Sequence, residues 1–274
     1  MGTITTKDGT SIFYKDWGPK DAQAIVFHHG WPLSADDWDN QMLFFLGRGF
    51  RVIAHDRRGH GRSDQPATGN DMDHYADDLA AVMDALDLKD AILVGHSTGG
   101  GEIARYVGRH GTSRVAGMVF IGAVIPNMAK SPANPDGVPM EVFDGIRKAV
   151  LDNRSGFYTT FPDTFFGWDQ GRPEEDGLRM AFWSQGMAGG AHAQYECVAQ
   201  FSESDFTEDL AAIDVPALII HGDADTVVPI DITARKAVEI ITDAKLLVYE
   251  GATHAIPAQE QDRLNQDLMA FARR

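Results

Sequence analysis

The fold is decided by one stretch of the chain, Ile92-Leu93-Val94-Gly95-His96-Ser97-Thr98-Gly99-Gly100-Gly101-Glu102-Ile103-Ala104. An apolar run enters a Gly-x-Ser-x-Gly sequence, and a helical pattern follows at once. This order is typical of a tight strand-to-helix turn that strains the serine backbone and exposes its hydroxyl at the helix N-terminus. Side chains at Gly95 and Gly99 would collide with the neighbouring turn and strand. The stretch therefore predicts Ser97 as a nucleophile; the alternative is a glycine-rich turn with an idle serine.

Short apolar runs alternate with amphipathic stretches on both sides of this turn. That alternation predicts an α/β fold, with a mostly parallel sheet covered by helices. The expected strands are Ala24–His28, Arg51–His55, Ala91–Gly95, Val115–Ile121, Ala217–His221 and Lys245–Tyr249, after an N-terminal hairpin that turns at Asp8-Gly9. The expected helices are Asp37–Leu46, Met72–Leu86, Thr98–His110, Ile230–Ile241 and Gln259–Ala272.

The alternation stops once, between about residues 123 and 211. Turn-rich segments and helical pieces rich in Phe, Trp and Met replace the strands there. A long insert without strands between two sheet strands predicts a helical cap over the strand ends; ordinary helices on the outer faces of the sheet are the alternative. We expect a core made of residues 1–122 and 212–274, and a cap made of residues 123–211.

A serine nucleophile needs a histidine base, and the base needs a carboxylate that fixes its tautomer. In hydrolases with this turn, the acid and then the histidine follow the serine in the chain. His254 lies just past the last expected strand and is the only histidine with both the right order and a loop position. Asp223 and Asp225 compete for the acid. We favour Asp225, because it lies further out on the loop and Asp223 is placed to tie the turn.

The charge that develops on the attacked carbonyl needs backbone N–H donors. Thr98 follows the nucleophile directly and supplies one. The second is expected from the loop after Ala24–His28, where Trp31 keeps its N–H and Pro32 has none. We therefore predict an oxyanion hole formed by Trp31 and Thr98, although Trp31 could equally be a core aromatic.

Several further motifs carry a family resemblance. They are the His29-Gly30-Trp31 loop, the Ala54-to-Asp64 stretch AHDRRGHGRSD, the elbow around Ser97, Val215-Pro216 and His221-Gly222-Asp223. Together they resemble the bacterial cofactor-free haloperoxidases and arylesterases, over nearly the whole chain. The resemblance implies an α/β-hydrolase fold with an eight-stranded core and a helical cap. It also implies ester hydrolysis and perhydrolysis, in which hydrogen peroxide replaces water as the acyl acceptor, with no cofactor. Members of this family commonly have Met where this chain has Thr98, which changes the pocket wall.

The predicted substrate is a small apolar or aryl carboxylic ester. Position beside the proposed triad and the family likeness give the candidate pocket residues, any of which could instead be plain core: Trp31, Val124, Met128, Phe161, Phe165, Phe201 and Val227. Two alternatives to a serine esterase stay open. One is a small-lactam or carbon–carbon bond hydrolase that uses the same triad, and the other is a ligand receptor without catalysis.

Composition limits the partners. Forty acidic and 24 basic residues give a formal charge of −16, which disfavours nucleic acid and anionic membrane surfaces. Cys197 is the sole cysteine, so an internal disulfide is excluded. No apolar run is long enough to cross a bilayer, and the first residues lack a signal-peptide pattern. We therefore expect a cytoplasmic enzyme that acts on a small molecule, with a homo-oligomer left open. The histidines His28, His29, His55 and His60 lack a metal-binding spacing, so no metal site is expected.

Overall fold

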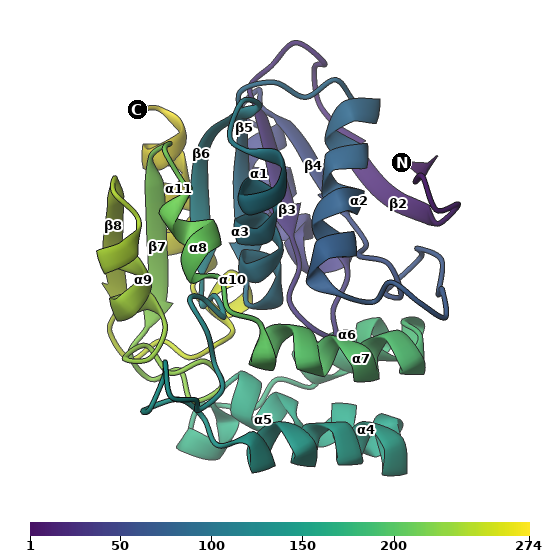
Figure 1. The fold of residues 1–274 in the computed structure, drawn as a ribbon, viewed down its shortest axis with the longest axis vertical. Helices are drawn as coiled ribbons and strands as arrows, with labels where there is room; N and C mark the ends of the chain where they lie inside the picture. Colours follow the sequence, from purple (N-terminus) through teal and green to yellow (C-terminus); the bar gives the residue numbers. More distant parts are fainter.

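An eight-stranded sheet forms the centre of the molecule (Figure 1). The computed structural model describes residues 1–274. The strand order is β1-β2-β4-β3-β5-β6-β7-β8, and only β2 runs against its neighbours. The strands are β1 (Gly2–Thr5), β2 (Ser11–Trp17), β3 (Ala24–His28), β4 (Arg51–His55), β5 (Ala91–His96), β6 (Val115–Ile121), β7 (Ala217–Gly222) and β8 (Ala244–Tyr249). The predicted mostly parallel sheet of eight strands is confirmed.

The strand ranges agree closely with the sequence prediction. β3, β4 and β6 have the predicted bounds, and β5, β7 and β8 differ from them by one residue. Strands β3, β4, β5 and β7 are buried along their whole length. Strands covered on both faces consist of continuous apolar runs, and for that reason the sequence identifies them well. The predicted N-terminal hairpin is formed by β1 and β2, with Asp8 in its turn.

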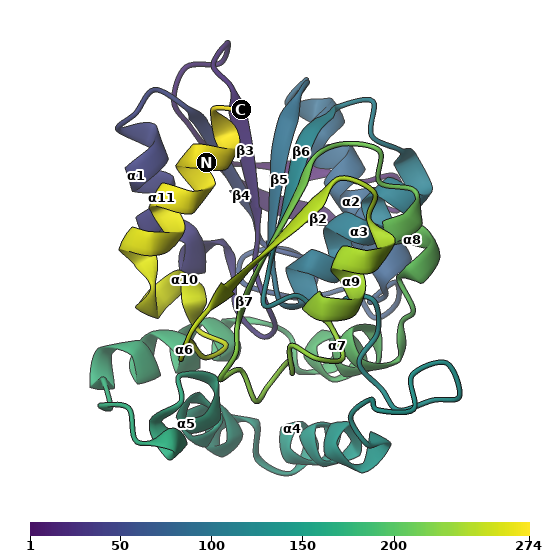
Figure 2. The same cartoon turned by 90° about the vertical axis from the view of Figure 1, so that its left-hand side faces the viewer.

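Helices cover both faces of the sheet (Figure 2). One face carries the 3-10 helix η1 (Ala35–Trp38) and the helices α1 (Asp39–Leu46), α10 (Ile256–Gln259) and α11 (Gln261–Ala272). The other carries α2 (Met72–Ala85), α3 (Thr98–His110), α8 (Thr207–Ala211) and α9 (Ala234–Ile240). Each face has its own hydrophobic core, one of 21 and one of 45 buried residues. The larger core continues into the helices between β6 and β7.

Three helices begin two or more residues later than predicted. Helix α1 begins at Asp39 instead of Asp37, because Ala35–Trp38 form the 3-10 helix η1. Helix α9 begins at Ala234 instead of Ile230, because Thr233 has a non-helical backbone (φ −121°, ψ −93°) and its hydroxyl donates to Pro229 O. The predicted Gln259–Ala272 helix begins at Gln261, since Glu260 (φ −112°, ψ 32°) separates it from the short α10. An apolar pattern indicates the face of a helix better than the residue at which the helix begins.

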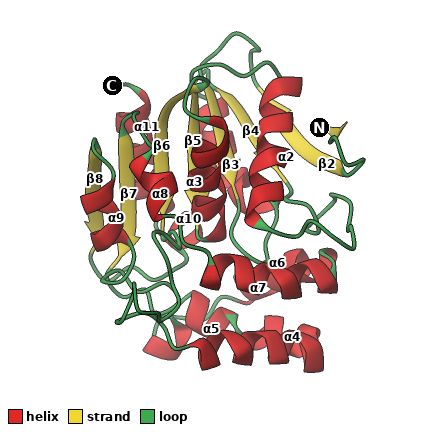
Figure 3. Ribbon diagram, viewed as in Figure 1, coloured by secondary structure: helices red, strands yellow, loops and turns green.

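Between β6 and β7 the chain forms helices and no strand, apart from one isolated bridge that joins Ala129 to Val138. These helices are α4 (Met140–Thr160), α5 (Pro162–Phe165), η2 (Trp168–Gln170), α6 (Asp176–Ala188) and α7 (Ala191–Glu203), followed by α8. Helices α4 to α7 lie across the carboxyl ends of the strands (Figures 1 and 3). In sheets of this kind, that edge is where ligands bind. None of the helices combines the length and the hydrophobicity that a membrane-spanning segment requires.

Candidate active site

Ser97 lies in a tight turn between β5 and α3. Its backbone has φ 54° and ψ −119°, a strained conformation for a residue with a side chain. A Cβ atom at Gly95 would lie 2.5 Å from Gly99 O, and one at Gly99 would lie 2.3 Å from His28 O. Both glycines are therefore required by close backbone approach, as the sequence predicts. The turn places Ser97 at the N-cap of α3, where the helix dipole favours negative charge.

The two predicted oxyanion donors lie next to this serine. A Cβ atom at Gly30 would lie 3.1 Å from Ser97 Cβ, so the loop that carries Trp31 passes directly beside Ser97. The Trp31 backbone N–H donates no hydrogen bond within the chain. Thr98 is the first residue of α3, where an N–H has no partner inside its own helix. Both N–H groups are therefore free to bind an anion, while the Trp31 indole is held by a 3.0 Å bond to Gln194 O.

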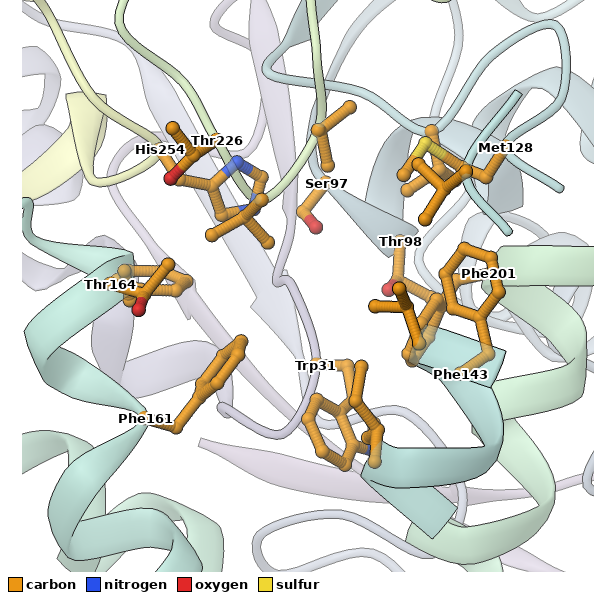
Figure 4. A pocket seen from close by; sticks show the side chains of 17 residues that line it. Trp31, Ser97, Thr98, Met128, Phe143, Phe161, Thr164, Phe201, Thr226 and His254 are labelled. Carbon is orange, nitrogen blue, oxygen red and sulfur yellow. The ribbon is translucent and has the colours of Figure 1, made fainter. Parts of the chain in front are cut away.

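Asp225 and His254 meet at the carboxyl ends of β7 and β8. His254 Nδ1 lies 2.7 Å from Asp225 Oδ2, and both side chains are almost fully buried. A Cβ atom at Gly122 would lie 3.3 Å from His254 Nδ1, so a glycine there leaves room for the pair. Ser97 and His254 line the same cavity (Figure 4), although no hydrogen bond joins them in the structure. Such bonds are often long before the substrate binds.

The Asp225 carboxylate is held in its charged form. Its Oδ1 atom accepts hydrogen bonds from the backbone N–H groups of Val227 (2.9 Å) and Val228 (2.8 Å). Burial by itself would raise the pKa of Asp225, but the neighbouring His254 and His221 lower this pKa below its ordinary value. Asp225 is thus an anion that accepts a hydrogen bond from the Nδ1–H of His254, which leaves His254 Nε2 to act as an acceptor. This is the tautomer that a serine hydrolase needs.

Asp223, the competing acid, has a different role. Its Oδ1 atom accepts a 2.6 Å hydrogen bond from Gly251 N, in the turn after β8. It therefore ties the loop after β7 to the loop after β8, as the sequence reasoning suggested. Asp223 forms no bond with His254, so Asp225 is the carboxylate that the structure brings to the histidine.

His96 is a contact that the sequence analysis missed. Its ring centroid lies 4.8 Å from that of His254, and its Nε2 atom donates to His254 O at 2.9 Å. Burial lowers the pKa of His96 to about 3, so its ring is neutral at ordinary pH. The neutral His96 ring therefore holds the His254 backbone without placing a positive charge beside the His254 ring. Only its position in the elbow, one residue before Ser97, could have signalled this role.

A buried ionic network lies behind the loop that carries Trp31, which we call the oxyanion loop. Glu102 accepts from Arg57 Nε at 2.8 Å, and His28 and His55 lie 2.9 and 3.0 Å from its other oxygen. Arg57 also donates to His29 O at 2.8 Å, which ties the network to the loop that leads to Trp31. Burial favours the neutral acid, but the Arg57 charge lowers the pKa of Glu102 well below its usual value. The network therefore positions the oxyanion loop from behind.

Arginine–aspartate pairs hold the stretch from Asp56 to Asp64 in place. Arg62 Nε lies 2.8 Å from Asp56 Oδ2, and Arg58 pairs with Asp78 at 2.6 Å and with Asp8 at 2.8 Å. Arg57, however, pairs with Glu102, whose importance the sequence analysis missed. The ligand atoms of His28, His55 and Glu102 lie within 4.8 Å of one another, the one grouping with a metal-like composition. The Arg57 guanidinium already neutralises this carboxylate, so the residues present do not favour a cation there.

A cavity of about 200 Å³ lies next to Ser97 (Figure 4). Twelve of its 17 lining residues are hydrophobic. All seven candidate pocket residues line it: Trp31, Val124, Met128, Phe161, Phe165, Phe201 and Val227. The structure adds seven residues that the sequence analysis did not single out: Val138, Val142, Phe143, Ile146, Thr164, Thr226 and Val228. The apolar spacing of Val142 and Ile146 at the start of α4 was a usable signal, whereas the threonines had none.

Comparison with known proteins agrees with this geometry. The family model for the alpha/beta hydrolase fold matches residues 23–261. The chain is 58% identical to a non-heme chloroperoxidase of Streptomyces lividans and 54% identical to a bifunctional esterase/perhydrolase of Acinetobacter calcoaceticus, with the full length of each chain covered. A bromoperoxidase structure from Bacillus anthracis superposes with a TM-score of 0.94 at 32% identity, over the whole of both chains.

The chain therefore belongs to the α/β-hydrolase family. Within this family it is an enzyme of the group that contains the non-heme haloperoxidases and the esterase/perhydrolase named above. The resemblance drawn from the sequence motifs is thereby confirmed.

Proposed function

We propose that the protein is a serine esterase that hydrolyses small apolar or aryl carboxylic esters through an acyl-enzyme. The observation that carries this proposal is the hydrogen bond between the Asp225 carboxylate and His254, which lines one cavity together with a strained serine. The lining is mostly hydrophobic, and such a cavity suits an uncharged acyl group better than an ionic one. The esterase/perhydrolase name of a relative 54% identical over its full length adds support.

In the proposed mechanism, Ser97 Oγ attacks the ester carbonyl while His254 Nε2 takes its proton. Asp225 stabilises the imidazolium that results. The backbone N–H groups of Trp31 and Thr98 bind the oxyanion of the tetrahedral intermediate. The intermediate collapses to the acyl-enzyme, and the alcohol leaves with the proton from His254. Water, deprotonated by the same histidine, then releases the carboxylic acid.

The second acyl acceptor that we propose is hydrogen peroxide. Attack of peroxide on the acyl-enzyme releases a peroxycarboxylic acid and restores Ser97. The peracid can oxidise a halide ion to hypohalous acid while it is itself reduced to the carboxylate. The halide is thus oxidised by the peracid after the peracid has left the enzyme, and this step needs no redox group in the protein. The non-heme haloperoxidase names of the relatives fit this sequence of steps.

We further propose that residues 123–211 act as a cap over a core of residues 1–122 and 212–274. Met128, Phe143, Phe161, Phe165 and Phe201 all belong to this segment and line the cavity. In this proposal the core supplies the catalytic groups and one wall, and the cap supplies most of the apolar surface that the substrate meets.

The test compares the wild type with the variant Ser97→Ala. Both are assayed on 4-nitrophenyl acetate, phenyl acetate, a small lactam and a vinylogous diketone. We expect ester turnover to fall by a factor on the order of 10⁴ or more. A fluorophosphonate should label the wild type at Ser97 and leave the variant unlabelled. Bromide oxidation should require an acyl donor and peroxide together. Ester turnover near the wild-type rate in Ser97→Ala would overturn the proposal, and preferred turnover of the lactam or the diketone would overturn the ester assignment.

A further inference from the structure

The Thr98 side chain is an unusual group in this cavity. Only 1% of the residue is exposed, and its hydroxyl makes no hydrogen bond within the chain, yet it lines an otherwise apolar space near Ser97 (Figure 4). The other two threonines of the lining are engaged. Thr164 donates to Asp169 at 2.6 Å, and Thr226 accepts from Gln170 at 3.4 Å. The Thr98 hydroxyl is therefore open to the cavity and unpaired. Because buried hydroxyls usually have partners, a ligand that covers this hydroxyl should offer it one.

The chemistry of the proposed reaction decides which part of the ester lies near Thr98. His254 must protonate the leaving alcohol, so the alcohol lies on the His254 side of Ser97. Figure 4 shows His254, Thr226 and Thr164 on one side of the serine, and Thr98, Met128 and Phe201 on the opposite side. The acyl chain therefore extends towards Thr98. We refer to Thr98, Met128, Phe143 and Phe201 as the acyl side of the cavity.

The reach of the Thr98 hydroxyl is set by its own backbone. In the mechanism above, the Thr98 N–H holds the carbonyl oxygen of the ester. A side chain on the same residue lies close to the first carbons of the acyl group, next to that carbonyl. An oxygen atom on C2 or C3 of the acyl chain could pair with the hydroxyl. An alkyl chain would instead cover the hydroxyl and leave it without a partner, which costs binding free energy.

We propose that Thr98 makes the enzyme select acyl groups that carry a neutral oxygen substituent on C2 or C3, such as 2-hydroxy, 2-alkoxy and 3-hydroxy acids. This inference rests on the proposed function. The oxygen is neutral because the rest of the acyl side is apolar and has no cationic side chain to pair with a carboxylate. In this proposal Thr98 has two roles. Its backbone N–H binds the oxyanion, and its hydroxyl binds the oxygen substituent of the acyl group.

The experiment compares 4-nitrophenyl methoxyacetate with 4-nitrophenyl butyrate, two esters of nearly equal length that differ by an ether oxygen in place of a methylene. The measured quantity is the ratio of their kcat/KM values in the wild type and in Thr98→Val, because differences in intrinsic reactivity cancel between the two enzymes. Valine has the same shape and keeps the backbone N–H. We expect the ratio to fall about fivefold to tenfold in Thr98→Val, the equivalent of one neutral hydrogen bond.

Thr98→Ser, which retains the hydroxyl, should keep the ratio within about twofold of the wild type. Thr226→Val makes the same change on the His254 side and should also leave the ratio in place. An unchanged ratio in Thr98→Val would overturn the inference, as would an equal fall in Thr226→Val. Titration with a fluorophosphonate counts competent sites in each variant and corrects for misfolded protein. Failure of that titration in the wild type would instead contradict the proposed function itself.

Discussion

The floor and the roof of the cavity are built on different principles. The floor consists of strand ends, where Ser97, Asp225 and His254 are fixed by backbone geometry and hydrogen bonds. The roof consists of α4 to α7 and meets the cavity with apolar rings such as Phe143 and Phe161. Hydrogen bonds specify position closely, whereas packed side chains can be exchanged for others of similar size. In the proposed mechanism the floor carries out the reaction, and we expect the roof to determine which substrate undergoes it.

The sharpest test of the floor is Asp225→Asn. The amide has nearly the same shape, but it can present an N–H to His254 Nδ1 and so favour the wrong tautomer. We expect kcat on 4-nitrophenyl acetate to fall on the order of 10⁴-fold with a small change in KM. Asp223→Asn is the matched control, because Asp223 lies two residues away and only ties the loop to Gly251. Equal loss of activity in the two variants would show that loop geometry, and not the charge of Asp225, supports catalysis.

Much of the floor was predictable, because its signals are local. The strand before Ser97, the two glycines and the helix after it form one continuous pattern, and a loop histidine after the last strand is easily identified. The Asp225–His254 contact also follows from topology, since β7 and β8 are adjacent and parallel. The Glu102–Arg57 pair did not follow, because its partners are 45 residues apart and neither belongs to a known catalytic pattern.

For the roof, the sequence predicted that a helical segment lines the pocket, but it did not predict all of the residues that do so. Aromatic content indicated that residues 123–211 contain a pocket wall, and Phe161, Phe165 and Phe201 were correctly placed beside the cavity. Phe143 and Val138 were not, because their contact depends on how α4 and the segment before it pack across the strand ends. The sequence contains the apolar face of a helix, but the direction in which that face turns is set by tertiary packing.

A buried histidine next to the loop that carries Trp31 should make the protein sensitive to acid. His60 is fully buried beside His29, and burial, aided by the Arg57 charge, lowers the pKa of His60 to about 3. The unfolded chain binds a proton below its ordinary pKa of about 6.5, whereas the folded protein does not. The unfolded state then holds more protons, so the free energy of unfolding falls as pH decreases from about 6.5 towards 3.

One such histidine contributes a slope of up to about 1.4 kcal/mol per pH unit in this range. His60→Gln should therefore flatten the dependence of unfolding free energy on pH by about one proton between pH 6 and 4.5, whatever its effect on stability at pH 8. Urea unfolding followed by circular dichroism at several pH values measures the slope. His192→Gln in α7, at an exposed roof position, is the control and should leave the slope in place. Equal slopes for the wild type and His60→Gln would contradict the assignment.

The smallest effect is expected in the roof, from Phe143→Ala. Phe143 is 3% exposed in α4, packs against Phe201 with ring centroids 6.3 Å apart, and lines the acyl side of the cavity. Removing the ring creates space that a longer acyl chain can fill, and each buried methylene contributes about 0.8 kcal/mol. Partial filling of this space should raise the octanoate-to-acetate ratio of kcat/KM about fivefold to tenfold. The kcat on acetate should stay within about threefold of the wild type, because the floor is untouched.

Leu151→Ala on the same helix, at a side chain that is 69% exposed, is the control. If Phe143→Ala reduced kcat on acetate as strongly as Asp225→Asn, the division between a catalytic floor and a selective roof would fail, because the roof would then be needed to hold the reacting groups in place.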